Sequence, residues 1–183
     1  MNFDELVLAR QSVRRYDNHE VESEKIIQCL EAARWSPSAS NSQPWHFIVV
    51  DQEPLRTEVA KATFTEIQLI NKFTLQAPVL IVIVQQKPKL ITRLAMQVKK
   101  KEWPLIDIGI AAAHFCLKAT ELRLGTCMIG WFNENRIKEI LKIPADKNIG
   151  LLISLGYVPK DYRLRKKTRR QLSAISSYNK YAD

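Results

Sequence analysis

The sequence predicts an α+β domain in which helices flank a central β-sheet of mixed or antiparallel strands. Helix-like and strand-like segments alternate along the chain, and the strand-like segments at 77–85 and 149–157 are apolar enough to be buried on both faces. The chain has 183 residues, 46% of them hydrophobic, so it can bury one sizeable core. We therefore expect a single domain over residues 1–183.

The first half of the chain predicts two helices, a strand and a third helix. FDELVLARQ begins with a short helix, and ESEKIIQCLEAARW at 22–35 carries an apolar stripe at helical spacing. HFIVVD at 46–51 is typical of a strand. Pro54 suits the first turn of a helix, because the N–H that proline lacks would be unpaired there, and we expect this helix to run to about Phe73.

The second half predicts a buried strand at 77–85, a basic and less regular stretch to Trp103, and then the longest helix. That helix, LIDIGIAAAHFCLKATELRLG at 105–125, has apolar residues on more than one face. We therefore expect protein on most sides of it, in part from a second subunit. Gly125 is expected to close the helix in a left-handed conformation.

Two further elements precede the basic C-terminal tail. TCMIGWF at 126–132 is expected to form a strand or an extended loop. Asn133 can cap a short helix at 134–142, which Pro144 ends. A buried strand at 149–157 then completes the sheet.

The net charge of +9 comes from two short segments. Residues 86–101 hold six basic side chains and no acidic one, and residues 160–170 hold seven basic side chains with Asp161 alone opposing them. Such segments suit an anionic ligand, either nucleic acid or a phosphorylated small molecule, although a solvated basic face is an equal alternative.

Several familiar sites are excluded by spacing. No GxGxxG follows a strand, and in GTCMIGWF the lysine of a phosphate-binding loop is replaced by Trp131. The three cysteines form no CxxC pair and the three histidines are far apart, so we expect neither a disulfide framework nor a metal site. With no signal peptide or membrane-spanning run in view, we expect a soluble, cytoplasmic protein. An enzyme with this sequence would need a cofactor to carry the reactive atoms.

The loop PSASNSQPW at 37–45 is unusual for a helix-to-strand connection. It has no glycine, and most of its positions carry short polar side chains, amides or proline. A connection alone would need only a few residues and a glycine. The loop is therefore a candidate for ligand binding.

Together with this loop, the segments RQSVRRY, LGTCMIGWF and KKTR resemble the short-chain form of the FMN-dependent nitroreductase family, in the family's order and spacing. The resemblance covers almost the whole chain, and the SxSxNSQPW pattern is its most specific part. It implies a nitroreductase-like fold and a homodimer with an interface helix, with FMN bound between the subunits and NAD(P)H as the electron donor.

The resemblance also implies a phosphate site built from both chain ends. RQSVR places Arg10, Gln11, Ser12 and Arg14 at the flavin, with Arg10 at the phosphate and Arg14 at the pyrimidine edge, where a cation stabilises the reduced ring. A basic helix end is the structural alternative for this segment. Two further cations would complete the phosphate site, Lys167 and Arg169.

The remaining flavin contacts implied by the resemblance come from three segments. The other subunit would supply small side chains and amides to the ribityl chain and ring edge: Pro37, Ser38, Ala39, Asn41 and Gln43. The backbone near flavin N5 would come from Met128, Ile129 and Gly130, where glycine permits close approach, and Asn71 would contact the pyrimidine.

The implied reaction is a ping-pong transfer of hydride from NAD(P)H through the flavin to a nitroaromatic, a quinone or a related small-molecule acceptor. No side chain is expected to be an indispensable acid or base. Lys99, Lys100, Lys101 and Trp103 either border the substrate opening or form an exposed basic turn. Within the family, flavin reduction or fragmentation, dehalogenation and enone reduction are alternatives. Neither membrane nor nucleic-acid binding is expected, because the basic stretch at 86–101 lacks interleaved aromatic residues.

Overall fold

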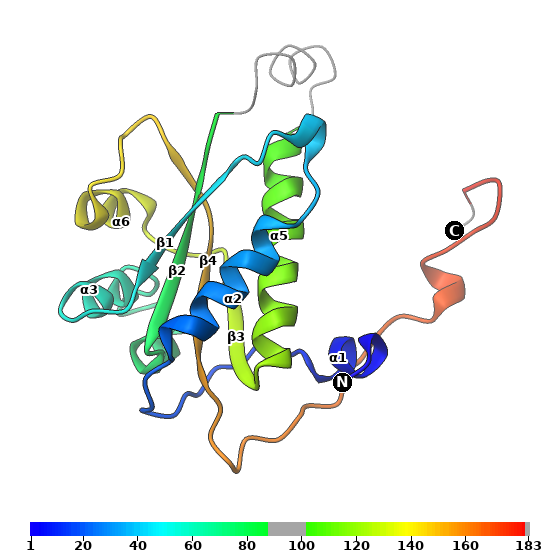
Figure 1. The fold of residues 1–183 in the computed structure, drawn as a ribbon, viewed down its shortest axis with the longest axis horizontal. Coiled ribbons are helices and arrows are strands. Elements are labelled where there is room, and N and C mark those ends of the chain that lie inside the picture. Colours follow the sequence, from blue (N-terminus) through cyan, green and yellow to red (C-terminus); the bar gives the residue numbers. More distant parts are fainter. Residues whose placement is uncertain (88–101, 182–183) are drawn as a thin grey trace.

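A computed structural model describes residues 1–87 and 102–181, and the prediction about Lys99, Lys100 and Lys101 lies outside these residues. The fold is α+β, as the sequence predicts. Four strands form one antiparallel sheet in the order β1-β2-β4-β3 (Figure 1). The strands are β1 (Trp45–Val50), β2 (Val79–Gln85), β3 (Leu124–Ile129) and β4 (Asn148–Tyr157).

Strand β2 lies inside the sheet and is buried on both faces, as its run of branched aliphatic residues predicts. Because side chains alternate along a strand, Leu80, Val82 and Val84 enter one hydrophobic cluster. Ile81 and Ile83 enter another cluster on the opposite face. The sheet therefore separates two apolar cores.

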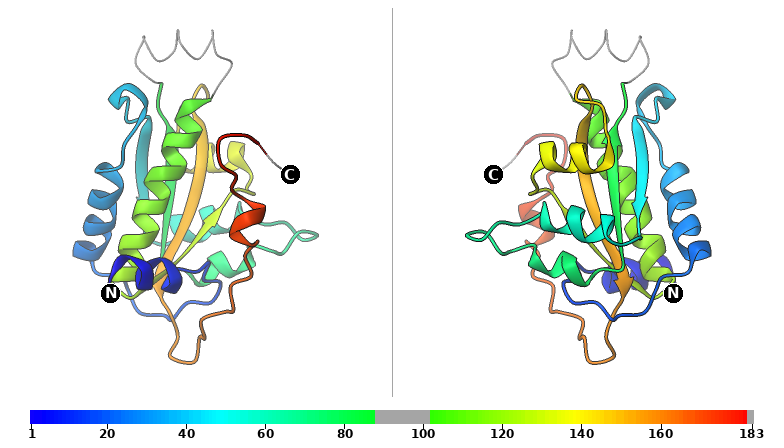
Figure 2. Two further views of the ribbon diagram at one scale, coloured as in Figure 1. Left: turned by 90° about the vertical axis from the view of Figure 1, so that its right-hand side faces the viewer. Right: turned by 90° about the vertical axis from the view of Figure 1, so that its left-hand side faces the viewer.

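Different helices cover the two faces of the sheet (Figure 2). The long helix α5 (Trp103–Glu121) and α2 (Ser23–Arg34) share one core, where Phe115 is fully buried. On the other face lie α3 (Leu55–Lys61) and α6 (Glu134–Leu141), whose Ile137 is fully buried. The short helix α1 (Phe3–Ala9) buries none of its residues.

The prediction that Gly125 caps α5 is wrong. The helix ends at Glu121, and Arg123 takes the left-handed conformation with φ 62°. Gly125 lies instead in β3, where a Cβ would be 2.6 Å from Val158 and 2.8 Å from Val13. This glycine is therefore required by close packing, which local sequence patterns do not reveal.

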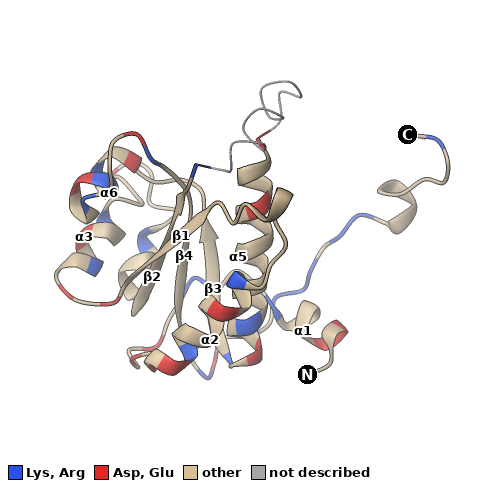
Figure 3. Cartoon of the chain, turned by 45° about the horizontal axis from the view of Figure 1, so that its top comes forward, with Lys and Arg blue, Asp and Glu red and all other residues tan. Residues whose placement is uncertain are grey.

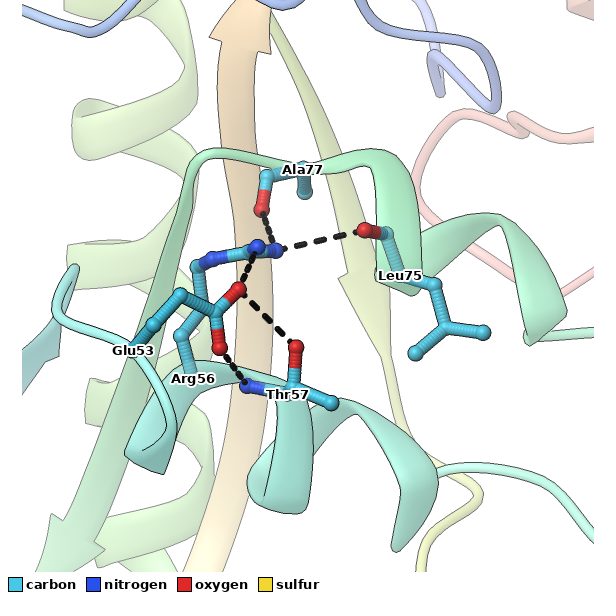
Figure 4. A network of polar contacts seen from close by, with 5 residues as sticks. All are labelled: Glu53, Arg56, Thr57, Leu75 and Ala77. Atoms are coloured by element: carbon cyan, nitrogen blue, oxygen red, sulfur yellow. Dashed lines mark hydrogen bonds and ion pairs between the residues drawn. The ribbon is translucent and has the colours of Figure 1, made fainter.

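The prediction of one helix from Pro54 to Phe73 is also wrong. Helix α3 ends at Lys61, and a turn of 3-10 helix, η2 (Lys72–Gln76), follows after an irregular segment. Arg56 fixes this arrangement, because its guanidinium donates to the carbonyl oxygens of Leu75 (3.2 Å) and Ala77 (2.8 Å) and pairs with Glu53 (Figure 4). These contacts join α3 to the chain that enters β2.

Helix α6 has the predicted start. The Asn133 side chain accepts a hydrogen bond from the backbone N–H of Arg136, which satisfies a free donor of the first turn. The helix ends at Leu141, and Lys142 follows in the left-handed conformation. The capping residue alone was therefore sufficient to predict where this helix starts.

Beyond β4, the chain runs past α1 and then leaves the body of the molecule as an extended arm (Figures 1 and 2). The arm contains one 3-10 turn, η3 (Leu172–Ala174), and its apolar side chains Leu172, Ile175 and Tyr178 are exposed. In the part of the chain that the structure describes, no helix is both long and apolar enough to cross a membrane.

Candidate functional site

The segment that carries Arg10, Ser12 and Arg14 is held beside the edge strand β3. Ser12 forms a parallel bridge with Thr126, and the Val13 N–H donates to the Thr126 carbonyl at 2.8 Å. Val13 itself is buried. The chain after α1 is therefore extended, with Arg14 exposed beside this anchor.

Tyr16 secures the end of this segment. Its hydroxyl lies 2.7 Å from the Ser154 hydroxyl and donates to the Val13 carbonyl at 3.1 Å. Burial raises the pKa of Tyr16 well above its ordinary range, so the phenol stays neutral at physiological pH. The segment is thereby tied to β4 as well as to β3.

The basic C-terminal segment pairs with the same residues from the other side. The Gln11 side chain accepts from the Arg165 N–H at 3.1 Å, and the Arg165 guanidinium donates to the Ser12 carbonyl. Tyr162 accepts from the Arg14 N–H at 3.2 Å. Figure 3 colours in blue the Lys and Arg positions along this part of the chain. Hydrogen bonds thus join two segments that lie about 150 residues apart in sequence.

Lys167 closes the C-terminal end of α1. Its ammonium donates to the carbonyl oxygens of Val7 (2.9 Å), Leu8 (2.6 Å) and Arg10 (2.6 Å). A lysine has three donors, and a helix end has unpaired carbonyls and partial negative charge. Lys167 therefore fixes the position of Arg10 while adding positive charge to the pocket described next.

A pocket of about 260 Å³ lies where the two chain ends meet, with Gln11 and Ser12 on its wall. Its lining includes six cationic side chains: Arg10, Arg14, Arg165, Lys166, Lys167 and Arg169. Burial and the neighbouring charges of Arg10 and Arg169 lower the pKa of Lys167. This mutual repulsion indicates a site suited to an anion, which would neutralise the cluster.

A second cavity, of about 550 Å³, adjoins this basic pocket and shares Arg10, Lys167 and Arg169 with it. Its other walls are largely apolar and come from α1, α5 and β3: Val7, Leu8, Ala113, Cys116, Leu117 and Met128. Burial raises the pKa of Cys116 to about 11, so its thiol is not a nucleophile at neutral pH. Together the two cavities offer a charged end and an apolar end.

The end of β3 supplies one open edge of this region. Met128 is 38% exposed, whereas the Ile129 side chain is buried in the core, so only its backbone is available to a ligand. A Cβ built on Gly130 would meet no atom within 4 Å. The chain therefore leaves free space at the position where the sequence predicts close approach to a planar ring.

Asn71 lies on the neighbouring loop and is buried. Its side-chain amide donates to the carbonyl oxygens of Thr63 (3.1 Å) and Trp131 (2.9 Å). The Arg14 guanidinium lies 6.0 Å from the centre of the Phe73 ring. Asn71 is thus bonded to the chain just after β3, and Arg14 lies near the 3-10 turn that follows Asn71.

The loop at 37–43 lies elsewhere, at the opposite end of α5 (Figure 1). The Ala39 N–H donates to the carboxylate of Asp107, near the start of that helix, whereas the second cavity is lined by residues 113–117. Six residues of α-helix, from 107 to the nearest lining residue at 113, span about 9 Å, and the residues that line the two cavities do not include the loop. One chain therefore does not bring Pro37, Ser38, Ala39, Asn41 and Gln43 to its own basic pocket.

The sequence-based set thus divides into two groups. One group surrounds the two cavities and the end of β3: Arg10, Gln11, Ser12, Arg14, Asn71, Met128, Ile129, Gly130, Lys167 and Arg169. The other group is the loop at 37–43. Sequence reasoning missed Arg165, Cys116 and Asp107. Arg165 shares the basic run with Lys167, and Asp107 is an isolated acid in an apolar helix, which was a usable signal.

The basic stretch at 86–101 is described only at its start. Lys87 pairs with Asp146 at 2.9 Å, and residues 88–101 lie outside the described ranges. Trp103 is half-buried at the first position of α5.

Comparison with known proteins gives a consistent result. Residues 7–157 match the model of the Nitroreductase family. A protein of Archaeoglobus fulgidus, named as an NADH dehydrogenase/NAD(P)H nitroreductase, is 33% identical over 160 residues, which cover 85% of this chain and 84% of the relative.

Solved structures agree in fold. A nitroreductase family protein from Clostridium novyi NT superimposes with a TM-score of 0.75 at 32% identity, covering 91% of this chain and 89% of the other. An FMN-dependent nitroreductase from Clostridium difficile R20291 gives a TM-score of 0.74 at 28% identity, covering 96% and 98%.

Proposed function

Because the chain belongs to the nitroreductase family, we propose that it is an FMN-dependent oxidoreductase that uses NAD(P)H to reduce nitroaromatics, quinones or related acceptors. The observation that carries this proposal is the cationic pocket beside the apolar cavity and the open edge of β3. FMN has a phosphate at one end and a flat, largely apolar ring system at the other. The two cavities match that division.

The residues fit this cofactor in their chemistry. Guanidinium groups of Arg10 and Arg169 would pair with the phosphate, since they can donate two parallel hydrogen bonds. Arg14 would supply positive charge at the ring edge, and Gly130 leaves room for the ring. When bound, FMN would supply the redox chemistry of a ping-pong transfer of hydride equivalents from NAD(P)H to the acceptor, while these residues would hold and orient it.

The protein's own contribution is to bind and orient these reactants. In the described residues, no three His, Cys, Asp or Glu side chains gather as a metal site, and the thiols of Cys116 and Cys127 have pKa values raised by burial. We therefore expect activity to depend on how the protein places the reactants and on the charges around them, rather than on one side chain that acts as an acid or base.

We also propose that the functional unit is a homodimer. The loop at 37–43 and the basic pocket lie at opposite ends of α5, so a second copy would be needed to bring one to the other. Apolar side chains that such a partner could cover are exposed on α1, α5 and the C-terminal arm: Phe3, Leu8, Leu105, Ile106, Leu172 and Ile175.

The basic C-terminal segment favours a small anionic ligand over nucleic acid. Arg165 and Lys167 donate to backbone carbonyls of the same chain and line the basic pocket, so their charges converge on one small site. A nucleic-acid site would need an extended track of cations with stacking aromatic side chains.

The test is reconstitution of purified protein with FMN. The complex should be yellow, its absorbance should bleach anaerobically with NADH or NADPH, and a quinone or nitroaromatic should restore it. Protein that remains colourless after incubation with FMN would refute the proposal. Halogenated phenols and enones, tested as acceptors in parallel, would reveal the alternative activities within the family.

A further inference from the structure

The carboxylate of Asp107 is the unusual feature of helix α5. It lies among apolar residues, is 5% exposed, and both of its oxygens lie 3.2 Å from the Ala39 N–H. Burying a carboxylate costs free energy unless hydrogen bonds compensate. A helix that needed only to pack against the sheet would gain more from an apolar residue here.

The loop held by Asp107 is conformationally strained. Ser40, Asn41 and Gln43 have φ values of 52°, 50° and 47°, in the left-handed region that residues other than glycine rarely adopt. Such a conformation persists only where surrounding contacts impose it. The loop therefore depends on hydrogen bonds and packing to keep this conformation.

Contacts within the loop provide part of that support. The Ser38 hydroxyl accepts from the Gln43 N–H at 3.0 Å, and the Gln43 side chain donates to Asn41 at 2.9 Å. These bonds set the shape of the loop but do not fix its place on the molecule. The bond from Ala39 to Asp107 joins it to the long, largely buried helix α5.

We propose that Asp107 is a positioning residue for cofactor binding, which holds the strained loop at 37–43 in the shape and place that receives the flavin. This inference rests on the proposed function, since it takes FMN as the ligand of the loop. Asp107 acts through Ala39 and needs no contact with the cofactor. Burial raises the pKa of Asp107, and the hydrogen bond from the Ala39 N–H opposes that rise.

The test compares Asp107→Leu and Asp107→Asn with the wild-type protein. Leucine is branched at the same carbon but is larger and has no acceptor, whereas asparagine has nearly the same size as aspartate and keeps one acceptor oxygen for the Ala39 N–H. Thr120→Ala is the matched control, because it removes a half-buried side-chain hydrogen bond on the same helix, to the Cys116 carbonyl, away from the loop.

Two measurements separate positioning from simple stability. Amide hydrogen exchange without FMN should show faster exchange at residues 39–43 in Asp107→Leu, with little change in the sheet. Titration with FMN should show affinity weakened about tenfold or more in Asp107→Leu, less in Asp107→Asn, and unchanged in Thr120→Ala.

The inference is overturned if Asp107→Leu binds FMN within about twofold of wild type, or if its loop amides stay protected. If Asp107→Leu does not fold, Asp107→Asn decides the question by the same two measurements. If wild-type protein binds no FMN, the proposed function fails, and with it the cofactor role of Asp107. Hydrogen exchange then still shows whether Asp107 orders the loop.

Discussion

Single residues at the junction of the two chain ends have different tasks although most of them are cationic. Lys167 donates to three carbonyls of α1, and Arg165 donates to the Ser12 carbonyl, so both hold the pocket together. Arg10 and Arg169 line both cavities and remain the best donors for a phosphate. The cations at this site thus hold the fold together, and we propose that they also bind the phosphate.

Replacement of Arg169 tests the binding task. We expect Arg169→Gln to weaken FMN affinity about tenfold or more, because a charge-assisted hydrogen bond contributes about 1.5–3 kcal/mol. Fluorescence titration with FMN measures this effect. Lys61→Gln, which makes the same charge change on helix α3, should leave the affinity unaltered. Equal affinities for both variants would place the phosphate elsewhere.

Gly130 tests the ring end of the site. A Cβ at Gly130 meets nothing within 4 Å, so we expect Gly130→Val to change the free energy of unfolding by no more than about 0.5 kcal/mol without cofactor. The same variant should weaken FMN binding, because the new side chain occupies the space proposed for the ring. Normal FMN affinity in this variant would contradict the proposed position of the ring.

By contrast, Gly156→Ala should destabilise the fold, since a Cβ there would lie 2.5 Å from Pro78.

Between elements, buried polar contacts fix how the segment at 10–16 joins the sheet. Tyr16 is the clearest case, because its hydroxyl bonds both to the Ser154 hydroxyl on β4 and to the Val13 carbonyl beside β3. Arg10, one of the two residues proposed to bind the phosphate, lies on this same segment, so a contact between elements sets its position.

Tyr16→Phe should lower the free energy of unfolding by about 1–2 kcal/mol at neutral pH, because the buried hydrogen bonds are lost. The pKa of Tyr16 is raised in the folded state, so the unfolded chain loses this proton first as pH rises. The contribution is therefore complete below the ordinary value of 10.0 and declines above it. Urea unfolding at about pH 7.5 and pH 10.5 measures the difference between wild type and variant. A difference that does not shrink at high pH would show that Tyr16 ionises alike in both states.

The whole molecule exposes large apolar side chains on α1, α5 and the C-terminal arm. Leu8 is 62% exposed and Ile175 is 61% exposed, on elements that lie on the side from which the arm extends. We interpret this surface as the face that a second copy covers, which would also bring the loop at 37–43 to the partner's basic pocket.

Ile106→Glu tests the assembly. Ile106 lies on α5 and is 57% exposed, so a charge there should allow the chain to fold but should disrupt a dimer and weaken FMN binding with it. Sedimentation velocity and FMN titration measure the two effects. Ile27→Glu on α2 has similar exposure (62%) and should leave both unchanged. A dimeric Ile106→Glu protein with normal FMN affinity would exclude α5 as the interface.

Features that depend on neighbouring residues could be predicted from the sequence. Strand β2 follows from its branched aliphatic run, the start of α6 follows from Asn133, and the α+β class follows from the alternation of elements. The motif residues at both chain ends were also identifiable, because their types and spacing carry the family resemblance.

Contacts between residues distant in sequence became visible only in the folded chain. In the folded chain, α3 ends at Lys61, and Gly125 lies in a strand against Val13. Lys167 contacts the end of α1, and Asp107 contacts Ala39. The physical reason is the same in each case. A buried donor, acceptor or Cβ must be satisfied or accommodated by whatever the fold places next to it, and local sequence does not specify that neighbour.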